Sequence, residues 1–199
     1  MTKLVLASTS PARKKLLAEA GILFETVAPG VDEDLVVSQT NPRSADELTR
    51  LLAKAKAQAV ASEFQDSLVL GCDSALEFDG QILGKPYLPE VAIDRWKAMR
   101  GKSGFLYSGH HLIDTASGTE LSAVSKTEVS FADLTDEEIV NYVATGEPLN
   151  VAGAFTIDGL GGAFVEKISG DYHTVVGLSL VELRKLVIAL GHDYQALWR

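Results

Sequence analysis

The sequence predicts an α/β fold with a central, twisted mixed sheet flanked by helices. Short apolar runs of strand length alternate with longer segments that begin at capping residues and carry apolar residues at helical spacing. No internal repeat, low-complexity tract or linker interrupts this alternation. The 199 residues, of which 46% are hydrophobic, are enough for one sizeable core or for two small lobes around a cleft. We therefore expect a single, two-lobed domain over residues 1–199.

The start of the chain predicts a strand, a helix and a second extended segment. Leu4 to Ala7 is a short apolar run, after which Ser10 can cap a helix. Pro11 occupies the first position of that helix, where a missing N–H group costs nothing. Residues 24–28 are typical of a strand, and the acidic residues 32–34 follow a Pro-Gly pair, which predicts a loop.

The middle of the chain predicts a long helix followed by a β-hairpin. Ser44 and Glu47 form a capping box that opens an alanine-rich helix to about residue 62. Ser67 to Gly71 is typical of a strand, and Ala75 to Phe78 continues in extended form. This segment ends at Asp79-Gly80, the dipeptide that most strongly favours a two-residue hairpin turn. The chain is then expected to return antiparallel.

The remaining elements follow from the same signals. We expect a helix from Pro89 to about Met99, strands over about 104–114 and 119–131, a helix opened by the capping box at Thr135, and a last helix over residues 180–190.

Composition excludes several partners and locations. Acidic residues outnumber basic ones by 27 to 18, and the formal charge of -9 repels a phosphate backbone, so we expect no nucleic-acid partner. Cys72 is the only cysteine, which excludes an intrachain disulfide and favours a small buried side chain in a strand. The apolar run of residues 4–7 is too short for a signal-peptide core, and no stretch approaches the roughly 20 apolar residues of a membrane span. We expect a cytoplasmic protein without a membrane partner.

Residues 8–13 predict an anion site. A strand that ends in small polar residues and turns into a helix N-terminus offers backbone N–H groups, hydroxyls and a partial positive charge. Arg13, in the first helical turn, adds a planar charged fork for phosphate oxygens. Taken alone, an ordinary capped helix explains the same residues.

Lys56 and Lys54 are expected to differ in their surroundings. At about 100° per residue, Lys56 lies only about 40° beyond the apolar stripe that contains Leu48 and Leu52, whereas Lys54 points nearly the opposite way. We expect the stem of Lys56 to pack while its ammonium enters a cleft, and we expect Lys54 to be solvated.

The hairpin is expected to bring Asp73 and Lys85 to one open end. A two-residue turn pairs Phe78 with Gln81 and, counting outward, Ser74 with Lys85. A carboxylate can orient water or hold a cation there, while a lysine offsets phosphate charge. Strict alternation places Asp73 and Lys85 on opposite faces, so this arrangement requires a kink at Gly71 or Gly84. A structural ion pair across the hairpin is the alternative.

Two other patterns are dismissed. Gly101-Lys102-Ser103 resembles the tail of a P-loop, but it lacks the upstream glycine and the preceding strand, which predicts a simple turn. His110 and His111 would face opposite sides of one strand, so no zinc site is expected.

Several motifs, in their order and spacing, resemble the Maf family, which was named for inhibition of septum formation. They are Leu6 to Arg13, Val31-Asp32-Glu33, Ala55-Lys56-Ala57, Gly71-Cys72-Asp73, Gly84-Lys85-Pro86, Ala152 to Phe155, Gly159 to Gly162 and Val175 to Leu178. The resemblance therefore covers nearly the whole chain.

The resemblance implies a nucleoside triphosphate pyrophosphatase. Such an enzyme hydrolyses the bond between the α and β phosphates, with in-line attack of water and pyrophosphate as the leaving group. The resemblance also implies two lobes around a deep nucleotide cleft, a homodimer, and a divalent cation, Mg²⁺ or Mn²⁺, as cofactor. A link to cell-division arrest would involve a division partner that the sequence does not identify.

Site residues are carried over from the resemblance position by position. Asp73 matches the family's proposed proton acceptor. The triphosphate would be gripped by Ser8, Ser10 and Arg13, its charge would be offset by Lys56 and Lys85, and metal and water would be served by Glu33 and Asp73.

The base-reading positions depart from the family's patterns. Members that prefer thymidine and uridine triphosphates have arginine, threonine and glutamine where this chain has Ala12, Ser74 and Asp158, and members that act on 7-methylguanosine triphosphate have tryptophan, glutamine and glutamate. Ionised Asp158 only accepts hydrogen bonds, so it suits a base that presents donors, such as guanine or cytosine. We therefore expect a guanine-type or cytosine-type preference.

Other functions fit parts of the sequence. A regulatory protein of septum formation could sense nucleotides without turnover, but it would not need Glu33, Lys56, Asp73 and Lys85 together. An inosine-triphosphate pyrophosphatase of related architecture is disfavoured by the N-terminal Ser-Thr-Ser-Pro loop. The leading interpretation is an enzyme that removes non-standard or excess nucleotides.

Overall fold

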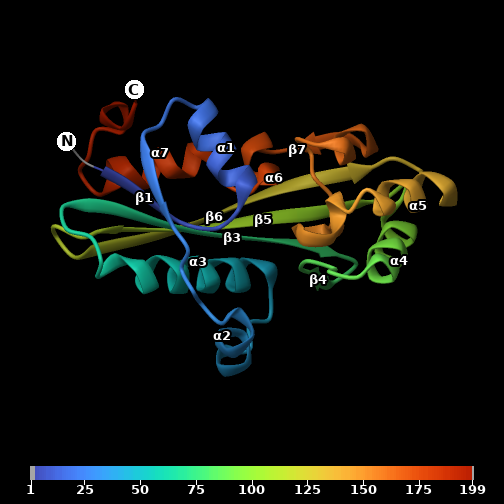
Figure 1. Cartoon of the computed structure of the whole chain (residues 1–199), viewed down its shortest axis with the longest axis horizontal. Coiled ribbons are helices and arrows are strands. Elements are labelled where there is room, and N and C mark those ends of the chain that lie inside the picture. The colour runs from blue at the N-terminus through green and yellow to red at the C-terminus, as the bar shows by residue number, and fades with distance from the viewer. Residues whose placement is uncertain (1–2, 199) are drawn as a thin grey trace. The chain divides into compact units, whose positions relative to one another are not determined.

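The computed structural model describes residues 3–198 and confirms a mixed α/β fold (Figure 1). Its strands are β1 (Lys3–Ala7), β2 (Phe24–Val27), β3 (Ser67–Phe78), β4 (Gln81–Leu83), β5 (Ser103–Asp114), β6 (Thr119–Phe131) and β7 (Val165–Ser169). Its α-helices are α1 (Pro11–Glu19), α2 (Glu33–Thr40), α3 (Ala45–Ala61), α4 (Pro89–Met99), α5 (Asp136–Ala144), α6 (Tyr172–Val176) and α7 (Leu180–Ala189). Short 3₁₀ helices are η1 (Glu147–Asn150), η2 (Ala152–Ala154), η3 (Leu160–Phe164) and η4 (Tyr194–Leu197).

Within residues 3–198, seven strands form one sheet in the order β2-β1-β3-β5-β6-β7, with β4 paired to β3. Strand β1 pairs in parallel with β2 and β3, whereas the β3–β4 and β6–β7 pairs are antiparallel. Ala7 lies opposite Gly71 at the last paired position of β1 and β3. This register places the residues that follow β1 beside Cys72 and Asp73.

The described residues fall into two compact units. The first comprises the chain up to Asp73, Ser108–Ser125 and the chain from Gly177 onward, and the second comprises Ser74–Tyr107 and Lys126–Val176. Strands β3, β5 and β6 are long enough to contribute residues to both units.

In the first unit, helices cover both faces of the sheet. Helix α3 lies on one face, and α1 and α7 lie on the other (Figure 1). A core cluster forms where apolar residues of α3 meet the strands; it includes Val5, Ala57, Val60, Val69 and Ile113. Burial of this apolar face, rather than helix propensity alone, holds α3 in place.

Helix α3 approaches the sheet closely because glycine occupies two strand positions beneath it. A Cβ atom at Gly71 of β3 would lie 2.0 Å from the carbonyl oxygen of Ala53, and one at Gly109 of β5 would lie 2.3 Å from that of Thr49. No side chain fits at such distances, so glycine is required at both positions. The helix backbone therefore rests directly on β3, two residues before Asp73.

In the second unit, Trp96 forms the centre of an aromatic cluster. Its ring makes edge-to-face contacts with Phe131, Tyr142 and Phe164 at centroid distances of 5.6, 5.7 and 5.9 Å. Its Nε1–H donates to the carbonyl oxygen of Ala154 at 2.8 Å, so the one polar atom of this buried ring has a partner.

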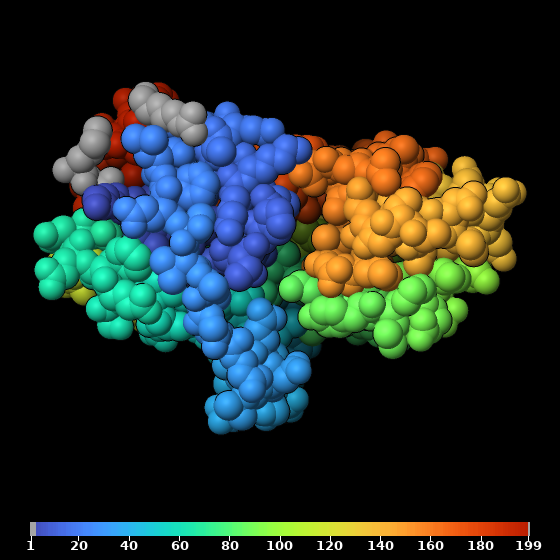
Figure 2. All heavy atoms as spheres, viewed as in Figure 1, coloured from blue at the N-terminus to red at the C-terminus, as the bar shows by residue number. Residues whose placement is uncertain are grey.

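Residues 33–40 form a helix, α2, where a loop was expected around residues 32–34. Asp32 caps it, and its carboxylate accepts from the N–H of Leu35 at 3.0 Å. No residue of α2 is buried, and the helix projects from the rest of its unit (Figure 2). The prediction failed because a helix without a buried face carries no apolar stripe in its sequence.

The hairpin turn is confirmed, but its predicted ladder is too long. Phe78 pairs with Gln81, and the ladder ends where Leu76 faces Leu83. The expected pair of Ser74 with Lys85 is therefore wrong. Strand β4 stops at Leu83, and the carbonyl of the next residue, Gly84, accepts from Arg95 Nη1 at 2.6 Å and from the N–H of Gly153 at 3.3 Å.

Candidate active site

A compact turn joins β1 to α1. The hydroxyl of Ser8 accepts from the N–H of Ser10 at 3.2 Å, and the hydroxyl of Ser10 accepts from the N–H of Arg13 at 3.4 Å. Ser10 is the N-cap of α1, and Pro11 stands at its first position, as predicted. The turn exposes Thr9 at the positive end of the helix dipole.

Arg13 ties this turn to two other parts of the first unit. Its Nε–H donates to the carbonyl oxygen of Gly177 at 2.7 Å. Its Nη1 donates to the carbonyl oxygen of Cys72 at 3.0 Å and to Ser8 Oγ at 3.4 Å. The side chain is buried, so the guanidinium fixes the turn against β3 directly before Asp73.

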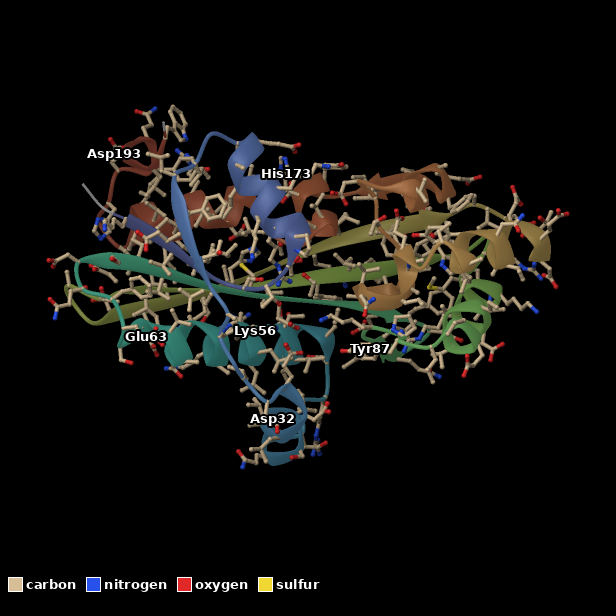
Figure 3. The ribbon with its side chains drawn as sticks, in the orientation of Figure 1. Asp32, Lys56, Glu63, Tyr87, His173 and Asp193 are labelled. Carbon is tan, nitrogen blue, oxygen red and sulfur yellow. The ribbon has the colours of Figure 1, made fainter. Side chains whose placement is uncertain are left out.

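Lys56 joins two carboxylates that come from different elements. Its Nζ lies 2.7 Å from Glu33 Oε1 at the start of α2 and 2.6 Å from Asp73 Oδ1 in β3. Figure 3 shows Lys56 on α3 and Asp32, the residue before Glu33, at the start of α2. The side chain of Lys56 is only 9% exposed, as its helical position predicted, whereas that of Glu33 is 44% exposed.

Lys54 is not simply solvated, as the sequence suggested. It forms an ion pair and hydrogen bond with Glu120 of β6, and its side chain is 44% exposed. Glu120 also accepts from Gln58 Nε2 at 3.1 Å. Lys54 and Gln58 of α3 are therefore attached to β6, through a residue that helical periodicity alone does not pair with them.

Burial has the largest influence on the pKa values of Cys72 and Asp73, two neighbouring residues of β3. It raises the pKa of Asp73 above its ordinary value, although Lys56 and Arg13 act in the opposite direction. Burial also raises the pKa of the Cys72 thiol to about 12. Cys72 is therefore a protonated, fully buried side chain, as expected, while Asp73 is a carboxylate with raised basicity.

The donor set fits a hydrated divalent cation that a substrate helps to hold. Glu33 and Asp73 both contact the ammonium of Lys56, so the two carboxylates already flank one positively charged group. Mg²⁺ typically takes one or two carboxylates and completes its shell with phosphate oxygens and water. Among residues 3–198, no group of three or more His, Cys, Asp and Glu side chains could hold a metal ion. The carboxylates would thus supply only part of the shell.

Sequence comparison assigns the family. Residues 3–190 match the family of Maf-like proteins. The chain belongs to the Maf family. Three relatives are each named nucleoside triphosphate pyrophosphatase. The protein of Salinispora tropica is 56% identical and the alignment covers 98% of this chain and 87% of the relative. The proteins of Streptomyces coelicolor and Leifsonia xyli are 52% and 51% identical, with 98% of this chain and 94% and 96% of the relatives covered.

The residues carried over from the Maf resemblance are divided between the two units. Ser8, Ser10, Ala12, Arg13, Glu33, Lys56 and Asp73 belong to the first unit, and contacts within it join Ser8, Ser10 and Arg13 in one cluster and Glu33, Lys56 and Asp73 in another. Ser74, Lys85 and Asp158 belong to the second. Lys85 is exposed after β4, and Ser74 and Asp158 are half-buried.

The roles of two residues that shape this Maf site were not predicted from the sequence. Gly71 admits α3 to β3, and the carbonyl of Gly177 receives Arg13. Both lie inside motifs that carry the resemblance, so their position in a motif was the available signal. Their structural roles could not be predicted from side-chain chemistry, because each glycine acts through its backbone.

No helix within residues 3–198 combines the length and apolar character that a membrane crossing requires.

Proposed function

We propose that this Maf-family protein is a nucleoside triphosphate pyrophosphatase, a hydrolase that splits the α–β phosphoanhydride bond to release a nucleoside monophosphate and pyrophosphate. The names of relatives with 51–56% identity support this reaction. The observation that carries the proposal is the buried ammonium of Lys56 between Glu33 and Asp73. In such an arrangement the lysine can offset the negative charge of a triphosphate, and the two carboxylates can bind the divalent cation that accompanies the triphosphate.

In this proposal the β1–α1 turn binds the triphosphate. Phosphate oxygens accept from the hydroxyls of Ser8 and Ser10 and from backbone N–H groups at the start of α1. Arg13 holds the turn in shape through its bonds to Cys72 and Gly177. Its fixed positive charge favours phosphate groups at the turn.

Asp73 is the proposed proton acceptor. The attacking water transfers a proton to its carboxylate while the water oxygen forms a bond to the α phosphorus. The bond to the bridging oxygen breaks, and pyrophosphate leaves with the electron pair. The raised pKa of Asp73 makes it a stronger base than an ordinary aspartate. Lys56 offsets the negative charge that accumulates on the phosphate oxygens.

Glu33 and Asp73 are the residues that would hold a divalent cation, Mg²⁺ or Mn²⁺. A bound cation would neutralise phosphate charge and polarise the phosphorus–oxygen bonds. Lys56 keeps the two carboxylates together, so their arrangement does not depend on the cation.

Base preference is the part of the proposal that goes beyond the relatives' names. Ala12 leaves the first base-reading position without a polar group, and Ser74 offers a hydroxyl at the second. Asp158 offers only acceptors when ionised, which supports a base with hydrogen-bond donors. We propose a guanine-type or cytosine-type substrate.

A nucleotide panel tests the reaction and the preference together. Pyrophosphate release is measured for standard and modified triphosphates with Mg²⁺ and with Mn²⁺. The proposal expects monophosphate and pyrophosphate in equal amounts, with guanine or cytosine nucleotides preferred. Strong preference for dTTP and UTP would contradict the base assignment. Nucleotide binding without release from any triphosphate would instead favour the sensing role in septum formation.

The biological role proposed is removal of unwanted nucleotides from the cytoplasmic pool, with an effect on cell division through that pool or through a partner. Charge offset by Lys85, assembly as a homodimer and the single-domain organisation are further predictions of the same proposal.

A further inference from the structure

Glu147 lies at the centre of a hydrogen-bond cluster in the second unit. Its Oε1 accepts from the Tyr142 hydroxyl at 2.9 Å and from the N–H of Gly161 at 2.9 Å. The same oxygen accepts from the Thr156 hydroxyl. Its Oε2 accepts from the N–H of Leu160 at 2.9 Å. One carboxylate thus connects α5 to the segment of residues 156–161, which we call the glycine loop.

The glycine loop packs directly against this cluster. A Cβ atom at Gly159 would lie 2.6 Å from Glu147 Oε2, and one at Gly161 would lie 2.4 Å from the Tyr142 hydroxyl oxygen. At Gly161 the backbone carbonyl oxygen of Thr156 would also lie within 2.8 Å of such an atom, which excludes a side chain. At Gly159 the side chains of Glu147 and Thr156 would have to move and give up hydrogen bonds. The loop's glycines and Glu147 therefore specify one conformation together.

The cluster requires an ionised carboxylate at residue 147. Burial opposes ionisation, but hydrogen bonds from Thr156, Gly161, Leu160 and Tyr142 outweigh it, and the net effect lowers the pKa of Glu147. Burial and the nearby carboxylate raise the pKa of Tyr142, so its hydroxyl keeps the proton that it donates. Every donor in the cluster therefore faces an acceptor.

We propose that Glu147 is a positioning residue that fixes the glycine loop and thereby sets nucleobase preference. Asp158 lies inside the loop, between the two segments that Glu147 holds through Thr156 and through Leu160. This inference rests on the proposed function, in which Asp158 reads the base. It adds that the direction of the Asp158 carboxylate is imposed by residue 147.

The test compares the full-length protein with the variant Glu147→Gln. The amide has the shape of the carboxylate, but one accepting oxygen becomes an NH₂ group that faces backbone or hydroxyl donors. Hydrogen exchange of the Leu160 and Gly161 amides should accelerate by at least about tenfold. The KM for preferred nucleotides should rise and the spread of KM across the panel should shrink by about threefold or more, with kcat changed less than KM.

Two further variants separate this role from general damage. Glu137→Gln changes an exposed acidic residue of α5 and should leave both exchange and preference as in the wild type. Tyr142→Phe removes one donor and keeps the aromatic packing, so it should give a smaller change of the same kind. It also provides the measurement if Glu147→Gln does not fold.

The outcomes are distinguishable. Unchanged amide exchange in both Glu147→Gln and Tyr142→Phe would overturn the positioning role. Faster exchange with an unchanged order and spread of KM would overturn the connection to the base. A wild-type protein that releases no pyrophosphate would overturn the proposed function, while the exchange measurement would still decide whether Glu147 fixes the loop.

Discussion

Lys56 is a buried positive charge that is balanced by two neighbouring carboxylates. Its ammonium meets Asp73 at 2.6 Å and Glu33 at 2.7 Å, one buried and one half-exposed carboxylate. Removing one partner of such a group is costly because the other charge is left without compensation. Its burial followed from helical spacing, but its partners could not be predicted from spacing. Only the family resemblance brought Glu33 and Asp73 into the same site.

Replacement of Asp73 by asparagine should separate binding from chemistry. Asparagine keeps the shape of the side chain but cannot accept the proton of the attacking water, so turnover should fall by about 100-fold or more while nucleotide affinity is retained. Pyrophosphate release and equilibrium nucleotide binding measure the two effects. The control is Glu63→Gln, an exposed residue just after α3 (Figure 3), which should behave as the wild type. Near-normal turnover of Asp73→Asn would remove Asp73 from its proposed role.

His111 should make the fold less stable in acid. Its ring lies 2.6 Å from Ser122 Oγ and 3.2 Å from Glu120 Oε2. Burial lowers the pKa of His111 below 6.5, although Glu120 acts in the opposite direction. The unfolded chain therefore binds this proton more readily than the folded protein, and stability is lost as pH falls below the ordinary value.

The measurement is the thermal midpoint as a function of pH. His111→Gln should flatten the decline between about pH 7 and pH 5, because glutamine does not titrate. An equally steep decline in His111→Gln would show that other groups cause it.

At the scale of elements, prediction from the sequence succeeded where a few neighbouring residues determine the local structure. The capping boxes placed the starts of α3 and α5, and Asp79-Gly80 placed the hairpin turn. It failed where an element lacks a buried face, as in α2, or where a strand ends before its expected ladder, as β4 does at Leu83. The close contact between α3 and the sheet was also not predicted. Gly71 allows this contact by having no side chain, and sequence patterns of apolar and polar side chains do not reveal such a contact.

The cap of α2 should influence cation dependence more than stability. Asp32→Ala removes the side chain that holds the first turn of α2, at a local cost of about 1 kcal/mol. Glu33 lies in that turn, so the cation concentration for half-maximal turnover should rise by about threefold or more. The thermal midpoint should change little because α2 has no buried residue. Asp34→Ala, which leaves the cap intact, is the matched control, and equal effects in both variants would contradict the role of the cap.

A methyl group at Gly71 should displace α3. The added carbon would lie 2.0 Å from a backbone oxygen, which cannot move aside as a flexible side chain could. Gly71→Ala should therefore lower the free energy of unfolding by about 3 kcal/mol, and it should reduce turnover because Lys56 moves with the helix. Gly84→Ala meets no atom within 4 Å and provides the comparison in denaturant unfolding. Equal stability of the two variants would refute the close approach.

At the scale of the whole molecule, the two units share three strands. Each unit has its own core cluster, yet β3, β5 and β6 contribute residues to both. Unfolding of one unit would remove strand pairing from strands that also belong to the other unit. We therefore expect the predicted single domain to unfold cooperatively. Calorimetry should give one transition whose calorimetric and van't Hoff enthalpies agree. Two resolved transitions would show that the units are independent domains.

The order of assembly follows from the bonds of Arg13. Lys56 and Asp73 are only 17 residues apart, so their pair closes a short loop. Arg13 reaches Cys72 across 59 residues and Gly177 across 164. The charged pair therefore costs little loop-closure entropy, whereas the phosphate turn gains its last anchor only once residue 177 has been synthesised. A truncated chain that lacks Gly177 would therefore leave the phosphate turn without one of its two distant anchors.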